Sequence, residues 1–320
     1  MPDCPGACAA AERCPLCDSN GPEAVLEGRT DHEYGVETRL RYLRCRDCHL
    51  VFAHPVPDAA TLASFYTSYS THAAQAPARS ALGRSLQRGL LAARSRELQK
   101  LLRRLPRAAR CLDYGCGAGT ALLTLNELGA ARVVGYEPDP LARLAASQQG
   151  LTVHGIEGDA LAEGPFDLVL LDHVIEHLPD PISTLRSLCA AMAPGGLLLM
   201  RTPNTQSLLA RWFGDRWRGW ETPRHLWLFG RSSIEALAPP LREAGLQLCG
   251  VKSSNRMFLG LLHGSLPPPR SRAMARVRNG VALLAWPSAE LWRWIASAIG
   301  RLVGEELLVL WQADVRRSLR

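Results

Sequence analysis

Lysine is almost missing from this chain of 320 residues, because Lys100 and Lys252 are the only two among 37 basic residues. The N-terminal stretch MPDCPGACAAAERCPLC lacks the apolar run of a secretory signal peptide, and we therefore expect an intracellular, cytoplasmic protein. In that compartment ten cysteines are more typical of metal ligands or core residues than of disulfides. We therefore do not expect a disulfide-rich secreted protein.

The balance of charge is positive. A net charge of +7 and an isoelectric point near 9.0 permit an acidic partner, such as nucleic acid or an anionic membrane surface. The excess is almost all arginine, which a general Arg, Ala and Leu bias of the composition also explains. With 47% hydrophobic residues, the length suits one large α/β domain with an appendage or two modest domains.

The cysteines are concentrated at the N-terminus, where six of the ten precede residue 50. Four of them form two C-x-x-C knuckles: Cys14, Cys17, Cys45 and Cys48. Paired thiolates of this kind predict a tetrahedral Zn2+ site, structural because it leaves no open position for a substrate. Asp18 and His49 follow the knuckles and are residue types that tolerate a left-handed backbone. For the additional pair Cys4 and Cys8, metal binding and a loose terminus are both open.

Three regions are expected: a zinc-ribbon module at 1–57, a helical linker region at 58–107 and a larger domain at 108–320. In the linker, residues 84–105 predict an amphipathic helix with a solvated, arginine-rich face. Beyond it, the expected strands are 110–114, 132–136, 151–154, 166–171, 196–202, 246–252 and 305–312, and the expected helices 119–129, 139–149, 181–192 and 231–244. The sequence APGG at 193–196 predicts a tight turn. This alternation predicts a doubly wound, mostly parallel sheet that binds a ligand at its carboxyl edge.

A glycine-rich loop, CLDYGCGAGT at 111–120, follows the first of these strands. Its glycines are Gly115, Gly117 and Gly119. Their G-x-G-x-G spacing differs from the dinucleotide fingerprint G-x-G-x-x-G, in which Thr120 would be the third glycine. Asp113, just before the loop, would repel a pyrophosphate but attract a cation or an ammonium group. The loop therefore favours a ligand that is positive where NAD is negative.

Acidic residues also follow the next strands. Glu137 lies 22 residues beyond Gly115, where a carboxylate binds ribose hydroxyls unless it merely caps the following helix. Asp159 follows the third strand, within reach of an adenine amino group, and Glu157 competes for that role. The fourth strand ends in a polar group: Asp172, His173, Glu176 and His177.

The series CLDYGCGAGT, VVGYEPDP, FDLVLLDHVIEHLPDP and APGGLLLMRTPN resembles the class I S-adenosylmethionine-dependent methyltransferases over residues 108 to 315. The resemblance implies a Rossmann-like α/β fold with a seven-stranded, mostly parallel sheet and a helical insertion, here at about 256–303, before the last strand. It also implies S-adenosyl-L-methionine as cofactor. The cofactor-binding residues would be Asp113, Gly115, Cys116, Gly117 and Gly119 on the methionine part, Glu137 on the ribose, Asp159 on the adenine, and Asp172 and His173 beside them.

The zinc ribbon and the segment TPNTQSLLARWFGDRWRGWETPRHLWLF are similar to a bacterial branch of this family with an N-terminal metal-binding module. Many members of that branch act on sugars, polyketides or other small metabolites. Methyl transfer needs a nucleophile in line with the methyl carbon, and a base where the acceptor must lose a proton. His225 and His177 are the candidate bases, and Glu176 is placed to orient either. Catalysis by proximity alone is the alternative.

Aromatic residues gather in two places. Four tryptophans fall just after the fifth strand, and one or two of them are expected at the ligand: Trp212, Trp217, Trp220 and Trp227. Nearer the N-terminus, Phe65, Tyr66 and Tyr69 are expected to line the join between the ribbon and the large domain.

Residues 278–303 predict a pair of apolar helices broken at Pro287. Glu290, Arg293 and Arg301 interrupt the apolar run, which argues against a transmembrane span. An interfacial helix, peripheral to the inner face of an anionic membrane or receiving a lipid-linked acceptor, is one interpretation. Packing as a lid or in a dimer interface is the other.

We therefore expect an enzyme that transfers a methyl group to an oxygen, nitrogen or carbon of a small acceptor, glycan-like or lipid-linked. The alternative is a nucleic-acid-binding or RNA-modifying protein that uses the ribbon and the arginine-rich helix. The lack of an N-P-P-Y type loop disfavours RNA base methylation, and a nucleic-acid partner is not expected. The glycine spacing and Asp113 disfavour an NAD-dependent oxidoreductase.

Overall fold

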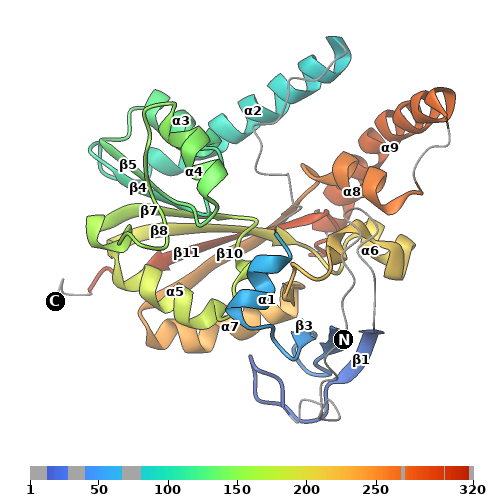
Figure 1. The fold of residues 1–320 in the computed structure, drawn as a ribbon, viewed down its shortest axis with the longest axis horizontal. Coiled ribbons are helices and arrows are strands. Elements are labelled where there is room, and N and C mark those ends of the chain that lie inside the picture. The colour runs from blue at the N-terminus through green and yellow to red at the C-terminus, as the bar shows by residue number, and fades with distance from the viewer. Residues whose placement is uncertain (1–12, 28–39, 67–80, 268–270, 299, 317–320) are drawn as a thin grey trace.

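Seven strands form the central sheet of the computed structural model, in the order β10-β11-β8-β7-β4-β5-β6 (Figure 1). Their bounds are β4 Arg110–Tyr114, β5 Arg132–Tyr136, β6 Thr152–His154, β7 Phe166–Asp172, β8 Met192–Pro203, β10 Leu246–Ser254 and β11 Glu306–Ala313. β4 to β8 pair in parallel, and β11 is antiparallel to both of its neighbours. The described residues are 13–27, 40–66, 81–267, 271–298 and 300–316. Within them the expected doubly wound, mostly parallel sheet is confirmed.

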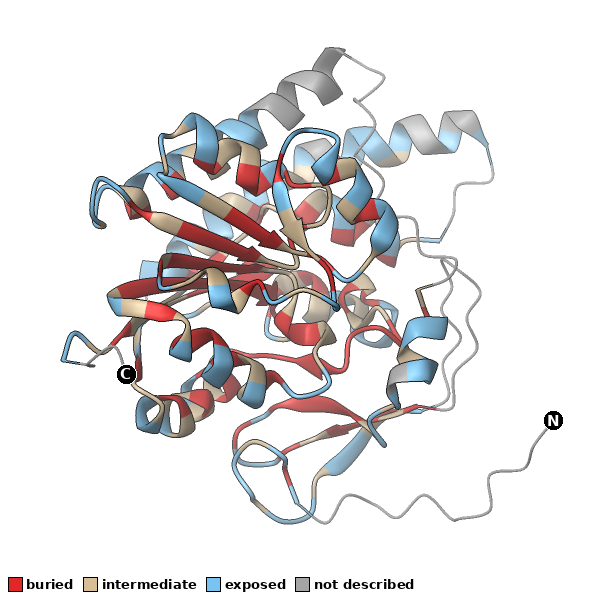
Figure 2. Ribbon diagram, turned by 60° about the vertical axis from the view of Figure 1, so that its left-hand side comes forward, coloured by how far each residue is buried: buried red, intermediate tan, exposed pale blue. Residues whose placement is uncertain are grey.

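Helices cover both faces of this sheet. They are α2 Ala81–Leu102, α3 Thr120–Glu127, α4 Pro140–Ser147, α5 Pro181–Ala190, α6 Leu208–Phe213 and α7 Arg231–Glu243. Alternate residues of β7 meet different helices: Leu168 and Leu170 pack with α2 and α3, whereas Val169 and Leu171 pack with α5 and α7. The inner strands are therefore buried on both sides, as Figure 2 shows, and the carboxyl ends of β4, β5 and β7 lie side by side at one edge.

A smaller antiparallel sheet contains β1 Glu23–Glu27, β2 Arg41–Arg44, β3 Val51–His54 and β9 Trp227–Leu228. The helix α1, Ala59–Ser64, follows it. Because β9 comes from the segment between α6 and α7, the large domain contributes a strand to the N-terminal sheet. The hydroxyl of Tyr42 also donates to the backbone oxygen of His225 at 2.8 Å. The N-terminal sheet is thus anchored beside a candidate catalytic histidine.

The insertion before β11 contains α8, Phe258–Ser265, and α9, Arg272–Ala298. The expected break at Pro287 is wrong, because α9 continues through this residue. A proline inside a helix removes one hydrogen bond, and here its ring is exposed while Ala282 and Ala289 on either side are buried. Among the described helices, none is both long and apolar enough to cross a bilayer.

The expected turn at 193–196 also differs. β8 already begins at Met192, which pairs with Phe166, and the glycines appear as an irregularity between that pair and the next one, Leu168 with Leu197. Gly195, at φ +75°, provides the left-handed backbone that this bulge requires.

Candidate active site

The glycine loop joins β4 to α3 through three left-handed residues, with φ of +82° at Gly115, +54° at Gly117 and +86° at Gly119. The amides of Gly115 and Cys116 donate to the backbone oxygen of Tyr136 at 2.7 and 3.0 Å, which ties the loop to the end of β5. A Cβ on Gly115 would collide with the side chain of Val174, whereas nothing lies within 4 Å of the corresponding position at Gly117. The loop is therefore held on its inner side and open at Gly117.

Asp113 is the last residue but one of β4, beneath this loop. Its side chain is only 2% exposed, and its Oδ1 has no hydrogen-bond partner among the described residues. Burial raises the pKa of this carboxyl to about 7, against the opposing effect of Arg94. A buried acceptor without a donor is unfavourable, and a ligand with an ammonium group would supply one.

Glu137 directly follows β5 and is 3% exposed. Its Oε2 accepts from the amide of Gly117 at 2.8 Å, and its Oε1 accepts from the amide of Asp139 at 2.9 Å. Asp139 caps α4, so the alternative role of Glu137 as a helix cap is not the one observed. Each carboxylate oxygen keeps a free lone pair for a hydroxyl. Asp159 is exposed after β6 and caps the next turn, accepting from the amides of Leu161 and Ala162.

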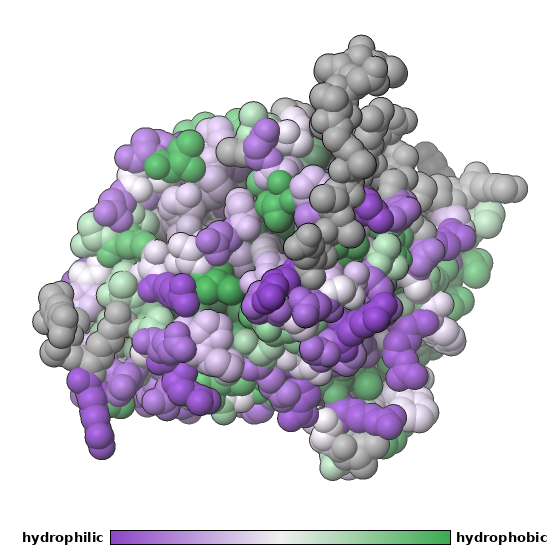
Figure 3. Space-filling view, turned by 90° about the horizontal axis from the view of Figure 1, so that it is seen from below, coloured by the Kyte–Doolittle hydropathy of each residue, from purple (hydrophilic) through white to green (hydrophobic). Residues whose placement is uncertain are grey.

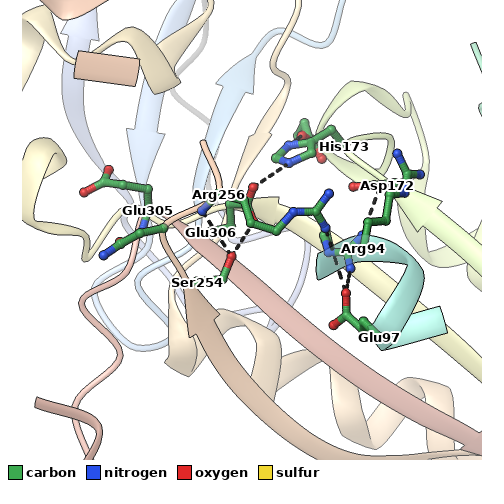
Figure 4. A network of polar contacts seen from close by, with 11 residues as sticks. Arg94, Glu97, Asp172, His173, Ser254, Arg256, Glu305 and Glu306 are labelled. Carbon is green, nitrogen blue, oxygen red and sulfur yellow. Dashed lines mark hydrogen bonds and ion pairs between the residues drawn. The ribbon is translucent and has the colours of Figure 1, made fainter. Parts of the chain in front are cut away.

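A network of charges closes the ends of β7 and β8 under α2 (Figure 4). Asp172 accepts from Arg94 and Arg201, each at 2.9 Å, and Arg201 also pairs with Glu97. Arg201 is 3% exposed, and burial lowers its pKa to about 9, so it remains charged at neutral pH. Asp172 is therefore not a free carboxylate but part of the contact that fixes α2 on the sheet.

His173 and Glu176 belong to the same edge. Nδ1 of His173 lies 3.2 Å from Oε1 of Glu176, and its Nε2 lies 3.5 Å from Oε1 of Glu306. Burial opposes a positive charge on His173, but the two carboxylates raise its pKa well above the usual value. Burial likewise opposes the charge of Glu176, yet the contact with His173 lowers the pKa of Glu176. Both shifts favour a charged pair, with the proton on His173.

His177 and His225 come from distant segments and meet edge to face, with ring centroids 4.7 Å apart. Nδ1 of His177 lies 3.1 Å from the oxygen of Arg224 and from the hydroxyl of Tyr66, and Nδ1 of His225 lies 2.8 Å from the oxygen of Gly219. Burial lowers the pKa of His225 to about 4, so this imidazole is neutral near pH 7. The structure thus brings Glu176, His177 and His225 together: a carboxylate oxygen of Glu176 and one ring nitrogen of each histidine lie within 4.8 Å of one another.

Sequence reasoning missed four members of this edge: Arg94, Glu97, Arg201 and Glu306. Arg94 was taken as part of a solvated helix face. Arg201 did carry a signal, because a lone arginine in the apolar run LLLMRT predicts a buried, paired charge. The aromatic residues expected near the ligand and at the join with the ribbon lie in different environments. Trp217 and Trp227 are buried in the core and Trp212 is 84% exposed, whereas Tyr66 contacts His177; Tyr69 lies outside the described residues.

The four cysteines of the knuckles also lie together. The Sγ atoms of Cys14 and Cys48 are 3.7 Å apart, and those of Cys17 and Cys45 are 3.5 Å apart. A tetrahedral zinc with bonds of about 2.3 Å places its sulfurs about 3.8 Å apart, so the group has the dimensions of a four-cysteine site. Asp18 and His49 have φ of +59° and +58°, as their positions after the knuckles predict. Cys4 and Cys8 lie outside the described residues.

The strand order and the site at the carboxyl edge are those of a class I S-adenosylmethionine-dependent methyltransferase. A family model described as "Methyltransferase domain" matches residues 85–249. The chain belongs to this methyltransferase domain family. The match does not favour the alternative of a nucleic-acid-binding protein.

Several curated relatives are named ubiquinone biosynthesis O-methyltransferase. One from Xanthomonas axonopodis pv. citri (strain 306) is 32% identical over 196 residues, which are 57% of this chain and 76% of the relative. One from Methylobacterium sp. (strain 4-46) is 40% identical over 101 residues, 29% of this chain and 40% of the relative. In the latter match, as in one from Ruegeria pomeroyi (strain ATCC 700808 / DSM 15171 / DSS-3), the chain spans about two-fifths of the relative's length.

Solved structures of methyltransferases are similar to this chain at lower sequence identity. A SAM-dependent methyltransferase from Archaeoglobus fulgidus shares 18% identity, with 68% of this chain and 94% of its own covered at a TM-score of 0.41. An S-adenosylmethionine-dependent methyltransferase from Mesorhizobium loti shares 17% identity, with 69% and 99% covered at a TM-score of 0.43.

Proposed function

We propose that the protein transfers a methyl group from S-adenosyl-L-methionine to a hydroxyl oxygen of a small acceptor. The observation that carries the proposal is the buried Asp113, whose Oδ1 lacks a donor directly beneath a glycine loop that is open at Gly117. A ligand with a cationic methionine part matches this site, and a pyrophosphate does not. The choice of oxygen is supported by relatives that are named O-methyltransferases.

When bound, the cofactor supplies a methyl group on a positively charged sulfur. Asp113 and the loop would hold its methionine part, Glu137 the ribose hydroxyls and Asp159 the adenine, with Asp172 and His173 forming the adjoining wall. The acceptor hydroxyl loses its proton, its oxygen bonds to the methyl carbon, and the carbon–sulfur bond breaks with its electron pair left on sulfur. We assign removal of the proton to the side of the site formed by Glu176, His177 and His225.

A methyl-transfer assay tests this proposal. With labelled S-adenosyl-L-methionine, we expect label in a hydroxylated acceptor, tested as a phenol, a polyprenyl-linked phenol and a sugar. His225→Gln should lower the transfer rate by about 100-fold, the size of a typical proton-transfer contribution, without changing cofactor affinity. The matched control is His154→Gln, on the edge strand β6, which should retain the wild-type rate. Label in none of the acceptors, with the cofactor bound, would contradict the proposed transfer.

Within this function, a lipid-linked acceptor reached at a membrane surface is supported by α9. One side of α9 carries a stripe of exposed apolar side chains, most of them three, four or seven residues apart. Between 42% and 78% of each side chain's surface is exposed. The members of the stripe are Met274, Val277, Val281, Leu284, Leu291, Trp292 and Ile295. By contrast, the face seen from below in Figure 3 is mostly hydrophilic, with apolar side chains in small groups. Arg278 and Arg293 lie on the same helix as the stripe. This pattern is typical of an interfacial helix on an anionic membrane.

Leu284→Glu is expected to weaken binding to vesicles that contain anionic lipid by about tenfold, because a leucine that enters the interface contributes about 1.5–3 kcal/mol. The measurement is co-sedimentation with vesicles. Leu141→Glu changes an equally exposed leucine of α4, 76% against 78% exposed, and should leave binding unchanged. Equal binding by Leu284→Glu and the wild-type protein would contradict the interfacial role of α9.

The ribbon is proposed to hold a structural zinc on Cys14, Cys17, Cys45 and Cys48, within an N-terminal unit at 1–57 followed by a linker at 58–107 and the catalytic domain at 108–320. We expect elemental analysis to find at least one zinc per chain that Cys45→Ser removes, together with a lower melting temperature, since structural zinc stabilises the fold it holds. Cys249→Ser changes an exposed cysteine of β10 and should retain the metal. A zinc content that Cys45→Ser leaves unchanged would contradict the site.

A further inference from the structure

We propose that Glu176, His177 and His225 form a second metal site, which binds a divalent transition-metal ion of the Mn2+, Fe2+, Co2+ or Zn2+ class. One ligand atom of each residue lies within 4.8 Å of the other two. Ligands around one ion, with bonds of about 2.1 Å, are about 3 Å apart, so the three would draw together on binding. Two imidazoles and one carboxylate are a ligand set that these ions share, and three protein ligands leave positions open.

The two histidines are held as metal-binding histidines are. Nδ1 of His225 lies 2.8 Å from the oxygen of Gly219, and Nδ1 of His177 lies 3.1 Å from the oxygen of Arg224. A carbonyl oxygen can only accept, so the contact with Gly219 places the proton of His225 on Nδ1 and leaves a lone pair on its Nε2, which lies 3.5 Å from Oε2 of Glu221. The contact of His177 with the oxygen of Arg224 favours the same tautomer, although its Nδ1 is also 3.1 Å from the hydroxyl of Tyr66. In metal sites the outer nitrogen of a ligand histidine donates in the same way, which fixes the ring and its tautomer.

Glu176 supplies an independent observation. Its side chain is completely buried, and Oε1 is held by His173 at 3.2 Å. Its Oε2 is buried with no hydrogen-bond partner in the described part of the chain. A buried carboxylate oxygen without a donor is strongly unfavourable, and a cation would provide the missing partner.

The location connects this site to the cofactor loop. Val174, which lies between His173 and Glu176 in the sequence, packs against Gly115. A divalent ion here would lower the pKa of an acceptor hydroxyl that contacts it. Glu176, His177 and His225 would then promote loss of the proton as metal ligands and not as bases, and the proton would leave to water before the oxygen bonds to the methyl carbon. This catalytic role rests on the proposed function, whereas metal binding itself does not.

The test is a titration with Mn2+ of the full chain carrying one Zn2+ per chain, any zinc outside the four-cysteine site having first been removed with a weak chelator. Binding is followed by the loss of the electron paramagnetic resonance signal of free aqueous Mn2+. Manganese prefers oxygen and nitrogen ligands, so it should leave the thiolate site to zinc. We expect one Mn2+ per chain, with affinity at least about 100-fold weaker in Glu176→Gln and in His225→Gln, since each lacks a ligand. His154→Gln, on β6, should bind like the wild-type protein. The melting temperature and S-adenosylhomocysteine binding of each variant show that it is folded.

The absence of saturable Mn2+ binding would overturn the proposal. So would binding that Glu176→Gln, His177→Gln and His225→Gln all leave unchanged. Saturable Mn2+ binding that these substitutions remove, without methyl transfer to any acceptor, would support the metal site and contradict only the proposed function.

Discussion

Replacement of Asp113 by asparagine is expected to weaken the binding of S-adenosylhomocysteine by about 100-fold. A charge-assisted hydrogen bond contributes about 1.5–3 kcal/mol, and the buried carboxylate lacks any other donor at its Oδ1. Asparagine keeps the shape of the side chain, so the fold should survive. The measurement is isothermal titration calorimetry.

The pH dependence of this binding gives a sharper signature. Because burial raises the pKa of Asp113 to about 7, the free protein is increasingly protonated below that pH. The ligand's ammonium group requires the carboxylate, so the affinity of the wild-type protein should fall as the pH drops from 7.5 to about 5.5, by up to about tenfold per unit below the pKa. Asp113→Asn should lack this dependence.

The matched control is Asp180→Asn, at the N-cap of α5, where the side chain accepts from the amide of Ser183. Asparagine can also cap a helix, so both affinity and pH dependence should remain those of the wild-type protein. An Asp113→Asn variant that binds as tightly as the control would contradict the role assigned to Asp113.

Arg201→Met is expected to lower the free energy of unfolding by about 3 kcal/mol. Arg201 is 3% exposed and pairs with Asp172 and Glu97, and removing one partner of a buried ion pair leaves charge uncompensated. The loss should be at the lower end of the usual range, because Asp172 keeps Arg94. Urea unfolding measures it.

Two further variants isolate the cause. Arg231→Met removes an exposed pair with Glu235 and a hydrogen bond to the oxygen of Gly300, and should cost no more than about 1 kcal/mol. Combining Arg201→Met with Asp172→Asn should cost less than the sum of the single changes, since the neutral amide no longer needs its partner. If Arg201→Met is as stable as Arg231→Met, the network does not fix α2 on the sheet.

Local signals predicted the central elements well. The strands expected at 110–114 and 132–136 are β4 and β5 with the same bounds, because turn residues bound each short apolar run. The positive φ of Asp18 and His49 followed from their places after the knuckles. The predicted helix break at Pro287 and the predicted turn at 193–196 were wrong. Packing of α9 maintains the helix through the proline, and pairing with β7 maintains β8 through the glycines.

The candidate site was predictable only in part. Residues at strand ends, such as Asp113 and Glu137, could be found because a parallel sheet brings its carboxyl ends together. The partners of Asp172 could not, because Arg94 is 78 residues away in the sequence and its helical spacing is also that of a solvated face. His225 meets His177 through contacts between distant segments, such as the hydrogen bond from the amide of Leu226 to the oxygen of Glu176, which no local pattern specifies.

The central claim is that the glycine loop and Asp113 bind the methionine part of a positively charged cofactor. Its most direct test is a calorimetric titration of the wild-type protein with S-adenosylhomocysteine, run beside NADH. We predict saturable binding of S-adenosylhomocysteine at one site per chain and no binding of NADH. Binding of NADH alone, or of neither compound by zinc-loaded, folded protein, would contradict the account.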